Sequence, residues 1–304
     1  EIYMPFGTAL EKTSAVADSL ESILRKDPRV VSVASFKGEG SPRFHTTYAP
    51  QMAGSHYAQF IVNTTGNEAT EQMIDEYKDK YLNYFPEARV RFKQLEYSDA
   101  VYPVEIRVKG NDRDSLRVAA DRVKKVMDGF DELSLVHSDW EGQLPGVTLQ
   151  LDDDEMGRLG MSKAMLSANL AMHLGNGLPV TTVWDKDYPI DVVLKDDGRS
   201  ELSYDEVGDT YVSAWGGAAS VPVRQIARVE PDWHDAQIAR RNGIPTITLQ
   251  SDVKNGVNAS AMTSKIVKAV EQIDMPEGIE WEVGGARESD SDTLNMIVSG
   301  LVIA

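Results

Sequence analysis

The alternation of apolar and polar positions along the chain predicts a series of strand-helix-strand units. Each unit has a strand of period two, a helix of period 3.6 and a return strand, and the units are expected at residues 2–36, 57–97, 104–136 and 247–283. One unit alone leaves an apolar face uncovered, so two units have to pack together to bury a core. The pattern therefore predicts an α+β fold with two subdomains, each built from tandem split β-α-β units in the ferredoxin-like arrangement.

Two local features of the first subdomain are predicted in more detail. The segment Thr8-Ala-Leu-Glu11 matches a capping box, in which the threonine side chain closes an exposed amide at the start of the first helix. The return strand of the second unit is expected to span residues 88–97, because apolar side chains alternate with charged ones there.

A long stretch between the third and fourth units interrupts the second subdomain and is expected to form an inserted α+β subdomain. It reads as a strand at 147–151, a short helix at 152–159, a helix capped by Ser162, and a hairpin of strands 178–184 and 188–194. The polar tip of this hairpin suits contact with another chain, and a plain solvated hairpin is the alternative.

Composition and the chain ends narrow the class of protein. Lys and Arg number 31 against 48 Asp and Glu, and the net charge of −17 argues against nucleic acid as a partner. The chain has no cysteine, which excludes a disulfide framework and suits an oxidising compartment such as the periplasm. The apolar run 296–304 is shorter than the roughly 20 residues of a membrane span. We expect residues 288–304 to be the start of a truncated transmembrane helix, with a buried C-terminal strand or helix as the alternative.

Sequence motifs also bear on catalysis and cofactor binding. The sequence contains no phosphate-binding loop, HExxH motif or nucleophile elbow, and its five histidines lack metal-ligand spacing. The acidic run Asp152-Asp-Asp-Glu155 fits a helix N-terminus better than a calcium site. We therefore expect no enzyme activity, no cofactor and no bound metal, with a metal-dependent hydrolase at this acidic run as a distant alternative.

Three segments carry a resemblance to a known family, and they follow one another in the family's order. They are Arg158-Leu-Gly-Met-Ser-Lys-Ala-Met-Leu-Ser-Ala-Asn-Leu170, Arg240-Arg-Asn-Gly-Ile-Pro-Thr-Ile-Thr-Leu249 and Gly284-Gly-Ala-Arg-Glu288. The chain resembles, over essentially its whole length, the second large periplasmic loop of resistance-nodulation-division (RND) efflux permeases of the acriflavine-resistance type.

The resemblance implies a domain organisation and a set of partners. Residues 1–98 would be the first porter subdomain, residues 99–137 and 232–287 the split second porter subdomain, and residues 138–231 the inserted docking subdomain. The full-length protein would be a proton-driven homotrimer in the inner membrane, and it would work with a periplasmic adaptor and an outer-membrane channel. Its substrate would be a small amphipathic or drug-like molecule that enters a cleft between the porter subdomains.

The resemblance and the local sequence together suggest substrate-binding residues. By resemblance, Phe36, Arg43 and Phe60 would line or gate the pocket. Phe44 and His45, which lie beside Arg43 on the loop 38–56, are added from the local sequence.

Two more site residues follow from the expected return strand of the second unit. If its Phe92 faces the core, Arg91 and Lys93 face the cleft. Their charges favour a polar, acidic or amphipathic substrate over a broad hydrophobic one. The alternative function is a ligand-binding or sensor module outside the cytoplasm that does not transport.

Overall fold

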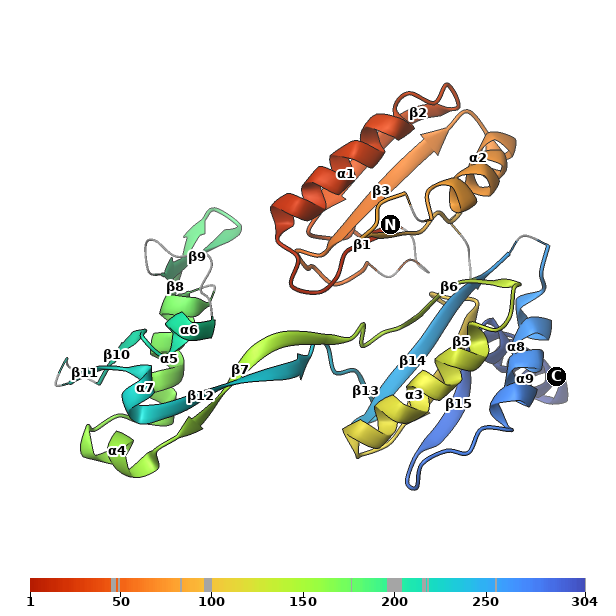
Figure 1. Cartoon of the computed structure of the whole chain (residues 1–304). Helices are drawn as coiled ribbons and strands as arrows, with labels where there is room; N and C mark the ends of the chain where they lie inside the picture. The colour runs from red at the N-terminus through yellow and green to blue at the C-terminus, as the bar shows by residue number, and fades with distance from the viewer. Residues whose placement is uncertain are drawn as a thin grey trace. The chain divides into compact units, whose positions relative to one another are not determined.

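The structure is a computed structural model that describes residues 1–44, 48, 50–82, 84–95, 100–175, 177–195, 204–214, 217, 219–254 and 256–303. It divides into two compact units, one made of residues 1–142 with 235–304 and the other of residues 143–234. Both units combine helices with antiparallel strands (Figure 1), which confirms the predicted α+β class. The first compact unit contains two sheets, and we call the parts around them the first module (residues 1–95) and the second module (residues 100–142 and 235–285).

The first module has its strands in the order β2-β3-β1-β4, all antiparallel to their neighbours. Its elements are β1 (Ile2–Tyr3), α1 (Leu10–Leu24), β2 (Val30–Lys37), β3 (Tyr57–Thr64), α2 (Asn67–Lys80) and β4 (Arg89–Val90). Alternate residues of β3 point to the helices, and Ala58 packs there with Leu20 of α1 and Met73 of α2. This core lies on one face of the sheet, and Tyr57 and Gln59 of β3 lie on the other.

The second module repeats the same plan. Its sheet has the order β15-β5-β14-β6, and β13 adds a short hairpin at the start of β14. Its elements are β5 (Val104–Lys109), α3 (Arg113–Met127), β6 (Leu133–Ser138), β13 (Arg240–Arg241), β14 (Ile244–Val253), α8 (Ala259–Val270) and β15 (Glu280–Gly285). Ile106 and Leu249 face Val123 and Ile266 of the two helices, and all four are almost fully buried.

Residues 143–234 form a separate unit with a core of its own. Its elements are β7 (Gln143–Leu151), α4 (Asp153–Arg158), α5 (Lys163–Leu174), β8 (Leu178–Asp185), β9 (Tyr188–Leu194), α6 (Tyr204–Val207), β10 (Tyr211–Ser213), β11 (Ser220–Pro222), α7 (Val223–Ile226) and β12 (Ala227–Asp235). Strands β7 and β12 pair as its stem, and Met156, Leu166, Val212 and Ile226 meet in its core. The expected hairpin is present as β8 and β9, and the residues of β9 are all exposed.

The helix N-termini show which capping predictions were right. Ser162 accepts a hydrogen bond from the Met165 amide, as expected, and Asp152 accepts one from the Glu155 amide. The capping box at Thr8 is wrong, because α1 begins one residue later and its N-cap makes no side-chain hydrogen bond. The Thr8 hydroxyl instead donates to the Pro5 carbonyl oxygen at 2.6 Å.

The C-terminal segment forms α9 (Ala286–Ile303), which leaves β15 directly. Leu294, Met296 and Val298 on this helix are exposed. None of the helices in the described part of the chain, α9 included, combines the length and hydropathy that a membrane crossing demands.

Candidate functional site

A cavity of about 770 Å³ lies within the first compact unit, with walls from both modules. The first module contributes α2 and the segment after β4, and the second contributes the end of β14 and the start of α8. Its apolar wall includes Ile74, Phe92 and Val257, while Glu71 and Asp75 line it from α2. A space of this size with mixed walls matches the usual dimensions of small-molecule sites.

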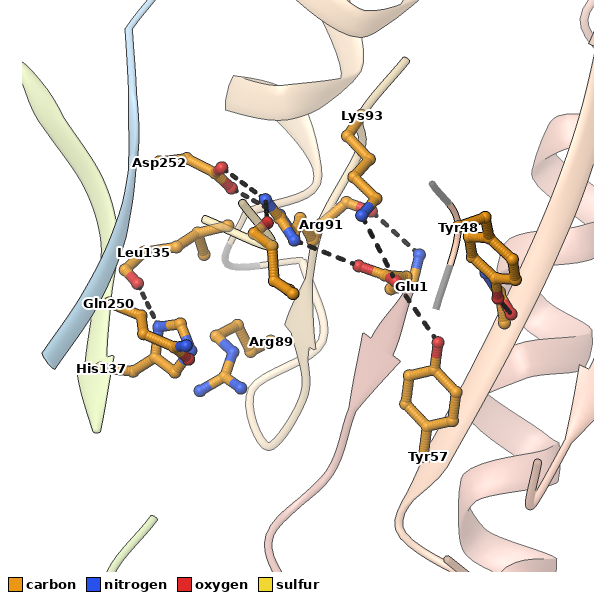
Figure 2. A network of polar contacts seen from close by, with 12 residues as sticks. Glu1, Tyr48, Tyr57, Arg89, Arg91, Lys93, Leu135, His137, Gln250 and Asp252 are labelled. Atoms are coloured by element: carbon orange, nitrogen blue, oxygen red, sulfur yellow. Dashed lines mark hydrogen bonds and ion pairs between the residues drawn. The ribbon is translucent and has the colours of Figure 1, made fainter. Parts of the chain in front are cut away.

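Arg91 stands at the edge of this cavity and is almost completely buried (Figure 2). Its Nε and Nη2 each donate a hydrogen bond of 2.7 Å to the carboxylate of Asp252, and Nη2 also donates to the Val101 carbonyl oxygen. Its guanidinium lies 3.8 Å from the ring centre of Tyr102. Burial disfavours the charged form, yet the hydrogen bonds and charge of Asp252 outweigh it and raise the pKa of Arg91. The side chain is therefore a buried cation whose charge is already balanced.

The local sequence explains why Arg91 points this way. Val90 and Phe92 turn toward the apolar core of the first module, so Arg91 between them turns to the opposite side. The return strand predicted at 88–97 is too long, because β4 covers only Arg89–Val90. Beyond Val90 the backbone pairing among the described residues continues only through the Glu1 and Arg91 main chains, and residues 91–95 are not strand.

Lys93 is the other predicted cation on this segment. Its side chain is 38% exposed and its Nζ lies 3.9 Å from a carboxylate oxygen of Glu1. It lines the 770 Å³ cavity and also a smaller cavity of about 320 Å³ in the first module. Unlike Arg91, it is solvent-accessible enough to meet a ligand.

The smaller cavity brings several predicted residues together. Phe44, Phe60, Arg91 and Lys93 all line it. It lies beside residues 59–64 of β3, which face no strand on the β1 side in the described part of the chain, since β1 pairs only with Tyr57 and Ala58.

The loop 38–56 is anchored to β3 through a buried side chain. The Gln59 side-chain oxygen accepts hydrogen bonds from the Ser41 amide at 2.7 Å and the Tyr48 hydroxyl at 2.8 Å. Phe44 is 53% exposed and stacks on Tyr48 with 4.8 Å between ring centres. The loop therefore places an aromatic pair at the edge of the smaller cavity.

Three predicted residues are not brought into either cavity by the described structure. Phe36 lies half-buried on β2 and Arg43 lies exposed on the loop, and neither lines either cavity. His45 lies outside the residues that the structure describes.

A second polar contact lies next to the Arg91 pair. Arg89 donates to the Glu141 carboxylate at 2.7 Å, and the imidazole Nδ1 of His137 lies 2.6 Å from the Leu135 carbonyl oxygen. Burial, helped by the positive charge of Arg89, lowers the pKa of His137 to about 4. His137 is thus uncharged at neutral pH and contributes no cation to the site.

Sequence reasoning missed the residues that complete the site from the second module. Asp252 follows Ser251 at the end of an apolar strand, and that polar pair was the available signal. Glu71 and Asp75, four residues apart on one helical face, were also overlooked.

Comparison with known proteins identifies the family. The sequence matches the profile of the AcrB/AcrD/AcrF family over residues 1–304, so the chain belongs to this family of RND efflux permeases, as the motifs predicted. It is 21% identical to the swarming motility protein SwrC of Bacillus subtilis (strain 168), over 98% of this chain and 28% of that protein. It is 22% identical to the multidrug resistance protein MdtC of Enterobacter sp. (strain 638), over 90% of this chain and 26% of that protein.

The fold agrees with a solved structure of the same class. The crystal structure of a heavy metal efflux pump superposes with a TM-score of 0.74 and 21% sequence identity, covering 99% of this chain and 32% of that one. The chain thus spans less than a third of the length of these proteins.

Proposed function

We propose that this chain is the periplasmic substrate-binding and docking portion of a proton-driven RND efflux transporter that exports small amphipathic or drug-like molecules. In this proposal the two modules are porter subdomains and residues 143–234 are the docking subdomain. The full-length protein would be a homotrimer of the inner membrane, and the docking subdomain would meet a periplasmic adaptor and an outer-membrane channel. Family membership supports the export of a substrate in general.

The observation that carries the proposal is the 770 Å³ cavity with walls from both modules. Its apolar wall suits the hydrophobic part of an amphipathic molecule, and its charged groups suit the polar part. Arg91 is not available to a substrate anion while Asp252 holds it, so the charge preference depends on the other charged groups of the lining. These are the lysines Lys78, Lys93 and Lys254 and the carboxylates Glu1, Glu71 and Asp75. Movement of the two modules about this cavity would alternately admit and release the substrate.

Ligand titration of the purified chain tests the proposal. We expect a fluorescent amphipathic anion and a matched cation to bind with different affinities, and Lys93→Ala to weaken the anion by about threefold to tenfold through the loss of one partly exposed charge. Isothermal calorimetry and fluorescence anisotropy measure both affinities. Lys125→Ala, which removes an exposed lysine from α3, is the matched control.

The result can also go against the proposal. If neither probe binds to the chain at millimolar concentration, the cavity is not a substrate site. If Lys93→Ala and Lys125→Ala change the affinity equally, Lys93 is not part of it.

A further inference from the structure

The two modules of the first compact unit are joined by a buried ion pair between residues 161 positions apart. Arg91 follows β4 of the first module and Asp252 lies near the end of β14 in the second, and their side chains are 3% and 13% exposed. Two parallel hydrogen bonds of 2.7 Å make this the bidentate geometry in which arginine binds a carboxylate most strongly.

Two local features of the second module determine the position of Asp252. The pairing of β14 with β6 shifts register between Gln250 and Asp252, and such a bulge redirects a side chain from its regular alternation. The Ser251 hydroxyl donates to the Ser134 carbonyl oxygen at 2.8 Å, which fixes the backbone next to Asp252. The backbone that presents the carboxylate is therefore fixed by contacts within the second module.

The same end of β14 receives a second contact from the first module. Lys78 of α2 donates to the carbonyl oxygen of Val253 at 2.7 Å. Arg91, Asp252, Lys78 and Val253 all line the 770 Å³ cavity. Any widening of the cavity that moves the modules apart at this point has to break these contacts.

We propose that the Arg91–Asp252 pair is a latch that holds the two modules together beside the cavity and opens when the cavity opens. This inference rests on the proposed function, since a latch matters only if the modules move. Arg91 is then a positioning residue that acts through the second module and is not a substrate ligand.

Such a latch has two stable states, one with the ion pair buried and formed and one with both side chains solvated. A paired and buried arginine is tolerated, and a fully solvated one is tolerated. A buried Arg91 that loses the bidentate Asp252 carboxylate and keeps only the 3.5 Å contact to Glu1 of its own module is costly. Intermediate separations are therefore disfavoured, and the modules are either joined or well apart. An ion pair that stays exposed to water at every separation would not give this two-state behaviour, because its charges would never be both buried and unpaired.

Distance measurements between two spin labels test the latch. The chain has no cysteine, so Ala15→Cys on α1 and Lys125→Cys on α3, both exposed, place one label on each module. Pulsed electron paramagnetic resonance then gives the distance distribution in the unsubstituted background, in Arg91→Gln, in Asp252→Asn and in the double variant.

The matched control is a second bidentate arginine pair inside one module. Arg29 donates to Asp27 through Nε and Nη2, and both residues belong to the first module. Arg29→Gln removes a similar ion pair without touching the junction between the modules.

We expect Arg91→Gln and Asp252→Asn each to add a separated population, raised at least about tenfold over the parent chain. The double variant should separate less than either single one, because it leaves neither a buried arginine nor a buried carboxylate without its partner. Arg29→Gln should lower the melting temperature but leave the distance distribution unchanged. Far-UV circular dichroism verifies that each variant is folded.

Two results would overturn the latch. One is an unchanged distance distribution in both folded variants, and the other is an equal change in Arg29→Gln. Ligand titration separates this failure from failure of the proposed function, because the distances are measured without ligand. If Arg91→Gln separates the modules but the chain binds no probe, the latch proposal stands and the proposed transport site is contradicted.

Discussion

At the scale of single residues, the second module contains two buried titratable groups whose pKa values move in opposite directions. Burial lowers the pKa of His137 from 6.5 to about 4. Burial also raises the pKa of Asp139 from 3.8 to about 6, although its carboxylate accepts a hydrogen bond from the Thr248 amide. Both groups prefer to be uncharged, and their effects on stability therefore have opposite signs with pH.

The direction in which His137 changes folding stability with pH follows from the number of protons bound in each state. Between pH 4 and 6.5 the unfolded chain binds a proton at this residue and the folded chain does not, so His137 makes the folded state more stable as the pH rises. We expect the stability of the parent chain relative to His137→Gln to increase by about 3 kcal/mol over that window. Urea unfolding at pH 4.5, 5.5 and 7 measures the difference in slope.

Asp139 provides a control, because its effect on stability changes with pH in the opposite direction. Its raised pKa stabilises the folded state below pH 3.8, and this stabilisation is lost as the pH rises through about 6. Relative to Asp139→Asn, the parent chain should therefore lose stability between pH 4 and 6. Parallel slopes for the parent and both variants would show that neither residue titrates differently on folding.

Individual residues also show which parts of the site could be predicted from the sequence and which could not. The alternation around Phe92 predicted that Arg91 and Lys93 face a cleft, and all three side chains line the 770 Å³ cavity. It could not reveal that Asp252 would neutralise Arg91, because that contact joins segments that only the tertiary fold brings together. Loop residues such as Arg43 follow no periodic rule, so their positions were the hardest to predict.

At the scale of elements, the helices and strands were predicted well where the apolar period was long. The hairpin β8–β9 lies close to its predicted strands 178–184 and 188–194, and α3 and α8 lie within the predicted units 104–136 and 247–283. The β4 prediction was too long, because β4 covers only Arg89–Val90 and residues 91–95 are not strand although apolar and charged side chains alternate there. The capping box failed because the hydroxyl of Thr8 was taken up by a local turn.

The difference between a real cap and an apparent one can be measured. Asn258 caps α8 by accepting a hydrogen bond from the Ala261 amide at 2.8 Å, so Asn258→Ala should destabilise the chain by about 1 kcal/mol. Thr8→Ala removes no cap and should cost at most a few tenths of that, about 0.3 kcal/mol. Denaturant midpoints of the two variants at fixed pH provide the comparison, and equal losses would contradict it.

At the scale of the whole molecule, separate cores account for the division of the chain. The first module, the second module and the unit 143–234 each have their own buried cluster. Strands β7 and β12 enter and leave the inserted unit side by side, and the Ala236 amide donates to the Gly142 carbonyl oxygen at the junction. The sequence could indicate this insertion because the strand-helix-strand pattern stops and resumes.

Removal of the inserted unit tests this independence. A chain in which a short Gly-Ser linker replaces residues 143–234 should keep the folds of both modules, because no residue of their cores is lost. We expect a single cooperative thermal transition and dispersed amide resonances. Strong binding of a hydrophobic dye together with a broad transition would show that the modules need the inserted unit to fold.

The shared strand order of the two modules has one last consequence. Ranked along the chain, both sheets read second, third, first, fourth, yet the final strand of the first module stops after two residues and that of the second runs for six. After β15 the chain continues directly as α9, whereas after β4 the next residue, Arg91, extends its side chain to Asp252 of the second module. The two modules thus share one strand order but differ in the segment that follows their last strand. In the first module this segment makes a contact to the second module.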